Sequence, residues 1–130
     1  MVKYMVFSLL AVLLTGLTGM AAEVTDITHD ELVKAVSEKK AVLIDCNGSD
    51  SYKSGHIPGA VDFATAKEEL AQKLPADKAA LIVAYCGNEH CPAYQAGAAA
   101  AIKLGYTNVK HYPGGIAGWK KSGEKMEVAN

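Results

Sequence analysis

The chain contains no arginine, and all thirteen of its basic residues are lysines. Arginine is the side chain best suited to hold a bulky oxyanion, because its planar guanidinium donates two parallel hydrogen bonds. The sequence therefore argues against a site built around a tetrahedral oxyanion. Fourteen acidic residues bring the formal net charge to -1. There is thus no excess of positive charge to attract nucleic acid or an anionic membrane.

Cysteine is also scarce, since the chain has Cys46, Cys86 and Cys91 and no others. An odd number at these spacings is not typical of a disulfide framework. Cys86, His90 and Cys91 lie close together in the sequence, but no second pair of ligands accompanies them, as a zinc site would require. We therefore expect no metal and no cofactor, and we interpret the unpaired thiols as candidate reactive cysteines.

The one long apolar run of the sequence lies at its N-terminus. Lys3 is followed by apolar residues and then by small residues up to Ala22, which is the order of a secretory signal peptide. We predict a signal peptide over 1–22, cleaved near Ala21 or Ala22. The remaining domain, 23–130, would be periplasmic or secreted and free of the membrane. An uncleaved anchor helix is the alternative, although the apolar run is short for a membrane span.

Short apolar runs alternate with helical patterns along the rest of the chain, whose length suits one domain. The runs AVLIDC at 41–46 and AALIVAY at 79–85 are typical of buried parallel strands. Thr28 and Glu31 fit a capping box at the start of a helix. This alternation predicts an open α/β sheet built from parallel crossover units. We expect strands at 24–27, 41–46, 79–85 and 109–112, helices at 28–39, 65–74, 92–104 and 116–121, turns over 47–55, and a short apolar segment of unassigned structure at 61–63.

Cys86 stands where one of the buried strands ends and a loop leads into a helix. Sites in open parallel sheets form at the carboxyl ends of the strands. Loop amides and a helix N-terminus stabilise negative charge, so this position predicts a lowered pKa and a nucleophilic thiolate. The alternative is a buried structural cysteine, which is common in strands.

Several ordered segments resemble the signatures of the rhodanese family. They are LID at 43–45 with YKSGHIPGA at 52–60, IVAYC at 82–86, and GYTNV at 105–109 with GGIAGW at 114–119. The resemblance implies a rhodanese-like fold, which is an open, mostly parallel sheet with helices on both faces. It also implies an activity that moves sulfane sulfur from thiosulfate or polysulfide, through a cysteine persulfide, to a thiol or cyanide acceptor.

On this resemblance Cys86 takes the place of the nucleophile. The loop that follows takes the place of the substrate-binding cradle and consists of Gly87, Asn88, Glu89, His90 and Cys91.

The sequence departs from the family pattern in two ways. Asn47 stands where the family often has an arginine, and Glu89 adds negative charge to the loop. The loop is also longer than in common members and in this respect resembles rhodanese-like phosphatases and arsenate reductases. Those enzymes need an arginine to hold their oxyanion, so sulfur transfer is favoured over phosphate chemistry.

Cys91 is the least expected feature of the loop. It can attack a Cys86 persulfide or resolve a Cys86 sulfenate, or it can simply pack against the start of the helix. Three hypotheses therefore remain. The first is an exported sulfurtransferase that uses Cys86. The second is a thiol–disulfide redox protein that uses Cys86 and Cys91, and the third is a non-catalytic rhodanese-like binding module.

The other polar and aromatic candidates have simpler interpretations. We expect Cys46 and His111 to pack in the core and Trp119 to anchor the last helix. His56 lies in the turn GHIPG, where a structural hydrogen bond is expected. Asp45 ends a buried strand, and we favour a structural role for its carboxylate.

Overall fold

The computed structural model describes residues 23–129. The signal peptide predicted for residues 1–22 lies outside them. No helix in the described part of the chain is long and apolar enough to cross a membrane. In chain order the elements are β1 (Thr25–Asp26), α1 (His29–Ser37), β2 (Ala41–Asp45), α2 (Ser49–Ser54), β3 (Val61–Asp62), α3 (Phe63–Ala66), the 3-10 helix η1 (Lys67–Glu69), α4 (Leu70–Lys73), β4 (Leu81–Tyr85), α5 (Tyr94–Lys103), β5 (Asn108–His111) and α6 (Gly115–Lys121).

The five strands form one parallel sheet in the order β1-β5-β4-β2-β3. The two longest strands lie side by side near its middle, with Ala41 opposite Leu81 and Asp45 opposite Tyr85. Their residues are almost continuously apolar because both faces of the sheet are covered. This confirms the open parallel α/β sheet that the alternating sequence pattern predicts.

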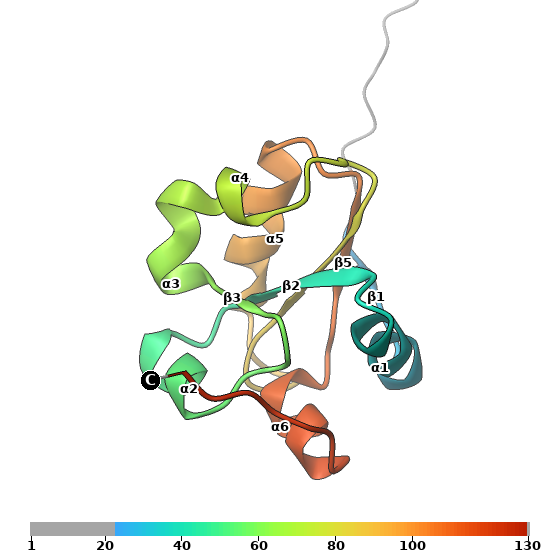
Figure 1. Cartoon of the computed structure of the whole chain (residues 1–130), viewed down its shortest axis with the longest axis vertical. Helices are drawn as coiled ribbons and strands as arrows, with labels where there is room; N and C mark the ends of the chain where they lie inside the picture. The colour runs from blue at the N-terminus through green and yellow to red at the C-terminus, as the bar shows by residue number, and fades with distance from the viewer. Residues whose placement is uncertain (1–22, 130) are drawn as a thin grey trace, which may run out of the picture.

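Each face of the sheet has its own hydrophobic core. Leu43 and Val83 point to the face covered by α1 and α6, whereas Ile44 and Ala84 point to the face covered by α4 and α5. Successive side chains of a strand alternate between faces, so one apolar run supplies both cores. Figure 1 shows α3, α4 and α5 on one side of the sheet and α1, α2 and α6 on the other.

Helix α1 begins with the predicted capping box. The hydroxyl of Thr28 accepts a hydrogen bond from the backbone N–H of Glu31 at 3.2 Å, and the Glu31 carboxylate accepts one from the Thr28 N–H at 3.2 Å. These two bonds satisfy donors that a helix start otherwise leaves free. They fix the helix so that Leu32 is fully buried against the sheet.

Two predicted segments differ in the structure. The single helix expected at 65–74 is wrong, because the chain forms three short turns, α3, η1 and α4. Asp62 causes the early start, since its carboxylate accepts a hydrogen bond from the Ala64 N–H at 3.2 Å and caps a helix there. The segment 47–55, expected to be turns, contains the short helix α2.

Candidate active site

Cys86 follows the last residue of β4, a central strand flanked by β2 and β5, and its side chain has no solvent exposure. The backbone N–H groups of Gly87 and Tyr94 lie near its sulfur and act to lower the pKa of the thiol. Tyr94 is the first residue of α5, so the loop and the start of a helix converge on the thiol. Such an arrangement stabilises negative charge on a sulfur atom or on a group bonded to it.

Cys91 lies against Cys86, and the three cysteines of the protein are free thiols. The Cys86 thiol donates a hydrogen bond to the carbonyl oxygen of Cys91 at 3.1 Å and interacts with the Cys91 sulfur as well. The N–H groups of Gly87 and Ala93 lie near the Cys91 sulfur and act to lower the pKa of that thiol. The Gly87 amide therefore serves both thiols, and two sulfurs share a cradle of three amides.

The two thiols have pKa shifts of opposite sign. Burial, together with the hydrogen bond to Cys91, raises the pKa of the Cys86 thiol to about 11. The hydrogen bond from Cys86 holds the pKa of the Cys91 thiol below its usual value, with help from the amides of Gly87 and Ala93. The lowered pKa expected at Cys86 is therefore wrong for the resting pair, because the lowered value belongs to Cys91.

The loop between the two cysteines is held by Asn88. Its side-chain oxygen accepts a hydrogen bond from the His90 N–H at 2.9 Å, and its carbonyl accepts one from the Cys91 N–H at 3.2 Å. The N–H groups of His90 and Cys91 thus form hydrogen bonds inside the loop and are not available to the two sulfurs. Of the amides in the predicted binding loop, that of Gly87 reaches the sulfurs.

The side chains of Glu89 and His90 lie on the outside of this loop. They are 73% and 86% exposed and form an ion pair at 3.4 Å. An exposed pair of this kind contributes little to stability. Both residues line a hollow of about 400 Å³ whose opposite wall is formed by α6 and includes Lys121. The carboxylate of Glu89 thus places negative charge on the wall of this hollow.

Helix α6 forms backbone hydrogen bonds with Cys86 and with the first residue of the loop, Gly87. The Ile116 N–H donates to the Cys86 carbonyl at 2.9 Å, and the Ala117 N–H donates to the Gly87 carbonyl at 3.0 Å. Gly115 precedes them with φ +62, and a Cβ at this position would lie 2.6 Å from the Cys86 oxygen. The GG pair of the sequence thus lets α6 come close enough for its amides to bond both carbonyls.

A buried polar network lies next to the end of β2. The Asp45 carboxylate accepts hydrogen bonds from the Asn47 N–H at 2.9 Å and from the Tyr85 hydroxyl at 2.7 Å. The Tyr85 hydroxyl in turn accepts one from the Ile57 N–H at 3.1 Å. Burial raises the pKa of Asp45. Its bonds join β2, β4 and the loop before β3, which agrees with the structural role expected for this carboxylate.

Cys46 is placed differently from the other two thiols. Its half-buried sulfur lies under α5, where a Cβ on Gly97 would come within 2.6 Å of it. Burial raises the pKa of Cys46 to about 12. The residue therefore behaves as the packing cysteine that the sequence predicts.

The remaining candidates hold the structure together. His56 Nδ1 lies 2.7 Å from the Tyr52 carbonyl oxygen, which is the structural hydrogen bond expected in this turn. Trp119 is buried, and its indole N–H donates to a backbone carbonyl in the segment after α6. His111 stacks on the ring of Tyr94 at 3.4 Å between centroids, so it supports the residue whose amide faces Cys86.

Sequence reasoning expected the first helix amides to face Cys86 but did not identify them as those of Ala93 and Tyr94. The signal was present in Pro92, because a proline at a helix start is followed by backbone N–H groups that have no partner within the helix. The prediction placed the helix start at Pro92, whereas α5 begins at Tyr94. This shift brings the free amides to the two sulfurs.

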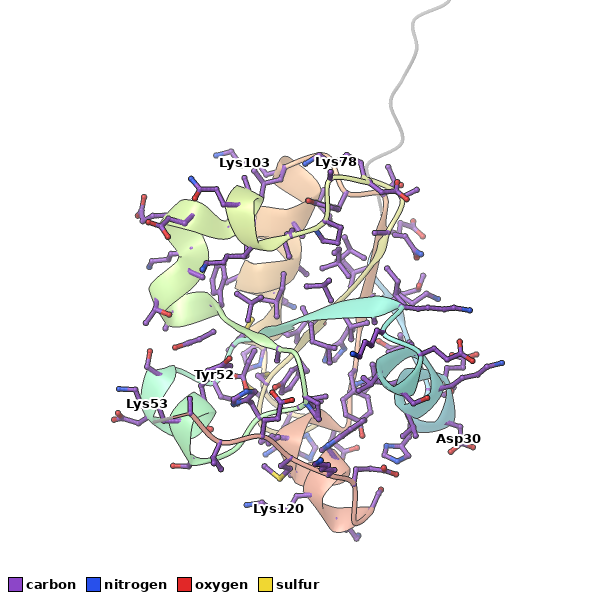
Figure 2. The ribbon with its side chains drawn as sticks, viewed as in Figure 1. Asp30, Tyr52, Lys53, Lys78, Lys103 and Lys120 are labelled. Atoms are coloured by element: carbon purple, nitrogen blue, oxygen red, sulfur yellow. The ribbon has the colours of Figure 1, made fainter. Side chains whose placement is uncertain are left out.

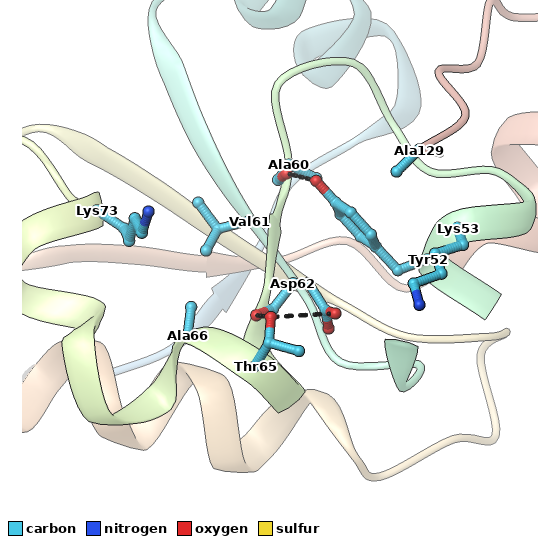
Figure 3. Close-up of a pocket in the computed structure, with 9 residues that line it drawn as sticks. All are labelled: Tyr52, Lys53, Ala60, Val61, Asp62, Thr65, Ala66, Lys73 and Ala129. Carbon is cyan, nitrogen blue, oxygen red and sulfur yellow. Dashed lines mark hydrogen bonds between the residues drawn. The ribbon is translucent and has the colours of Figure 1, made fainter. Parts of the chain in front are cut away.

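Figure 3 shows a second hollow, of about 390 Å³, beside β3. Two of its polar side chains already form hydrogen bonds: the Tyr52 hydroxyl donates to the Ala60 carbonyl at 2.7 Å, and the Thr65 hydroxyl donates to Asp62. No cysteine is among the residues that line it. Within residues 23–129 no group of three His, Cys, Asp or Glu side chains is placed to hold a metal ion.

The profile of the family described as the rhodanese-like domain matches residues 28–122. The chain is 28% identical over 124 residues to the uncharacterized protein YibN of Escherichia coli K12, a match that covers 92% of this chain and 82% of YibN. It is 32% identical over 95 residues to the thiosulfate sulfurtransferase GlpE of Coxiella burnetii RSA 331, covering 72% of this chain and 85% of GlpE.

Solved structures support the same fold. The human single-domain sulfurtransferase TSTD1 superposes with a TM-score of 0.60 at 21% identity, covering 76% of this chain and 97% of that one. At this level of identity the likeness concerns the arrangement of the sheet and its helices.

Proposed function

The chain belongs to the rhodanese-like domain family, and from this membership we propose that it transfers sulfane sulfur as a persulfide on Cys86. The observation that carries the proposal is the position of Cys86 at the end of β4 with the amides of Gly87 and Tyr94 directed at its sulfur. The curated relatives named thiosulfate sulfurtransferase, about a third identical to this chain, support it.

In the loading step Cys86 loses its proton and attacks the outer sulfur of the donor. The sulfur–sulfur bond of the donor breaks, and the leaving group, sulfite in the case of thiosulfate, departs with the electron pair. The persulfide now carries the negative charge, which the amide cradle stabilises. An acceptor thiol or cyanide then attacks the terminal sulfur, and the Cys86 thiolate leaves.

The burial of Cys86 sets a condition on loading. Because the resting thiol has no exposure, the donor reaches it only when the loop 87–91 moves aside. Asn88, Glu89 and His90 are exposed and belong to no helix or strand. Displacement of this segment breaks few buried contacts, so it is the local unfolding near the thiol that costs the least free energy.

The loop favours small sulfane donors such as polysulfide over thiosulfate, because no arginine is present to bind the sulfonate oxygens of thiosulfate. Glu89 repels an anion, and the chain has no arginine to grip one. The lysines labelled in Figure 2, Lys53, Lys78, Lys103 and Lys120, are spread around the molecule and do not form one cationic patch. Lys121 is the lysine that lines the hollow beside the loop.

We also propose that the protein is exported and acts in the periplasm or outside the cell. The order of charge, apolar run and small residues before Glu23 supports this. N-terminal sequencing of the protein recovered from the extracytoplasmic fraction of expressing cells tests it. We expect the mature chain to begin at Ala22 or Glu23, and a protein that retains Met1 in every fraction contradicts export.

Sulfur loading is tested by the intact mass of the reduced protein after treatment with a sulfane donor. We expect the mass of one added sulfur atom when Cys91 is replaced by serine, and its absence when Cys86 is replaced. Cys46→Ser in the same background is the matched control and should still gain the sulfur. If neither polysulfide nor thiosulfate adds sulfur to Cys86, the proposed function is wrong.

A further inference from the structure

We infer that Cys91 is a second sulfur-handling thiol, which attacks the Cys86 persulfide, releases hydrogen sulfide and leaves a Cys86–Cys91 disulfide. The inference rests on the proposed function, because it needs the persulfide to form. It gives the protein a second outcome for the sulfur besides transfer to an external acceptor.

The contact between the two side chains supports this reaction. In the resting protein the Cys86 sulfur bonds to the Cys91 carbonyl at 3.1 Å and interacts with the Cys91 sulfur. The Cys86 sulfur becomes the inner sulfur of the persulfide. Cys91 therefore lies beside the atom that it must attack to form the disulfide, with the terminal sulfur as leaving group.

The surroundings of the two thiols assign the attacking role to Cys91. The N–H groups of Gly87 and Ala93 point at its sulfur, next to the start of α5. These donors favour the thiolate, which is the nucleophilic form. Cys91 is also partly exposed, whereas Cys86 is fully buried. A thiolate at Cys91 can thus form and react without the solvation of Cys86.

The reaction balances without an external oxidant. A persulfide on Cys86 and a thiol on Cys91 give one disulfide and one molecule of hydrogen sulfide. The sulfane sulfur is reduced to sulfide while the two cysteines are oxidised. An external dithiol reductant then returns the pair to thiols by attacking the exposed Cys91 sulfur, so that Cys86 departs as the buried thiolate.

Cys46 provides the matched control for this pair. Its sulfur packs under α5, and its bonding partners are the Ile44 carbonyl and the Gly97 amide rather than another thiol. Replacing it with serine changes the number of cysteines without touching the contact between Cys86 and Cys91.

The experiment uses the purified full domain, reduced, freed of reductant and kept anaerobic, with inorganic polysulfide as donor. Intact mass, a non-reducing digest and released sulfide are measured for the wild type and for Cys91→Ser, Cys86→Ser and Cys46→Ser. We expect the wild type and Cys46→Ser to lose two hydrogens, to yield a joined Cys86–Cys91 peptide and to release one more equivalent of sulfide per chain than Cys91→Ser. Cys91→Ser should keep the added sulfur, and Cys86→Ser should show neither change.

The failures of the two proposals are distinguishable. If the wild type keeps its added sulfur with Cys91 still free, or if Cys91→Ser releases as much sulfide as the wild type, the inference is overturned and the persulfide carrier stands. If Cys91→Ser gains no sulfur, the proposed function fails and the inference fails with it.

Discussion

Cys86 and Cys91 are five positions apart and share the Gly87 amide, yet their surroundings affect them in opposite ways. Cys86 is sealed from water and faces a carbonyl oxygen, so its proton is retained. Cys91 lies beside the Cys86 thiol and the amides of Gly87 and Ala93, which favour its thiolate, so its proton is lost more readily. The resting pair therefore holds its first negative charge on the more accessible sulfur.

This division predicts the order in which the thiols react with iodoacetamide. Alkylation requires the thiolate, so Cys91 should react first, with a rate that inflects at a pH below that of an ordinary cysteine. Cys86→Ala removes the donor to Cys91 and should move the inflection to higher pH, whereas Cys46→Ala should leave it unchanged. Alkylation mapped by peptide mass gives the order, and an inflection that ignores Cys86→Ala would contradict this division of charge.

Gly115 permits a second prediction about a single residue. Gly115→Ala places a Cβ within 2.7 Å of two carbonyl oxygens and also strains a backbone with φ +62. We expect a loss of about 3 kcal/mol in the free energy of unfolding, measured by urea denaturation. Gly123 has φ +77 but no atom within 4 Å of a Cβ, so Gly123→Ala isolates the backbone strain and should cost about 1 kcal/mol. Equal losses in the free energy of unfolding for the two variants would show that the close approach of α6 to the loop does not contribute to stability.

Among the elements, the sequence predicts the long strands and the capped helix but not the short turns. The runs at 41–46 and 79–85 are apolar enough to require burial on both faces, and Thr28 and Glu31 mark a helix start by themselves. The break within 63–73 depends on Asp62 at the end of β3, whose capping role becomes visible only when that strand is paired. Local pattern thus fixes elements that bury a continuous face, while tertiary contacts set the limits of the others.

For the candidate site too, the sequence predicts the position of a residue in the fold but not its tertiary contacts. The sequence places Cys86 at the end of a strand and before a helix, and the structure agrees. It cannot show that the amides of His90 and Cys91 are engaged by Asn88, or that those of Ala93 and Tyr94 reach the sulfurs. Nor can it show which thiol is buried, and burial is what raises the pKa of Cys86, which the sequence predicts to be lowered.

Helix α5 carries part of the amide cradle, so its distance from the sheet should affect both stability and chemistry. Gly97→Ala would place a Cβ 2.6 Å from the Cys46 sulfur and 2.9 Å from an Ile44 methyl carbon. We expect a destabilisation of about 2 kcal/mol and a rise in the pKa of Cys91, as the Ala93 amide moves away. Cys46→Ala in that background should restore about 1 kcal/mol, measured as a double-mutant cycle. Additive effects would contradict a direct contact between these two positions.

At the scale of the whole molecule, the chain has no arginine, so no guanidinium is available to bind an anionic sulfur donor near Cys86. Glu89→Gln removes the carboxylate nearest the loop, so we expect loading by thiosulfate to accelerate roughly two-fold at low salt, and less at high salt. Glu68→Gln removes the same charge from η1 and should have a smaller effect. Loading rates from intact mass at several salt concentrations give the comparison, and equal rates for the two variants would show that Glu89 does not affect the approach of the donor.

The central claim is that Cys86 carries the sulfur. The most direct measurement is the mass of the Cys91→Ser protein after anaerobic treatment with polysulfide, followed by a digest that locates the added atom. The account predicts one added sulfur on the peptide that contains Cys86 and its loss on addition of a thiol acceptor. No added sulfur, or sulfur on Cys46 alone, would contradict the account and favour a rhodanese-like domain that binds a partner without transferring sulfur.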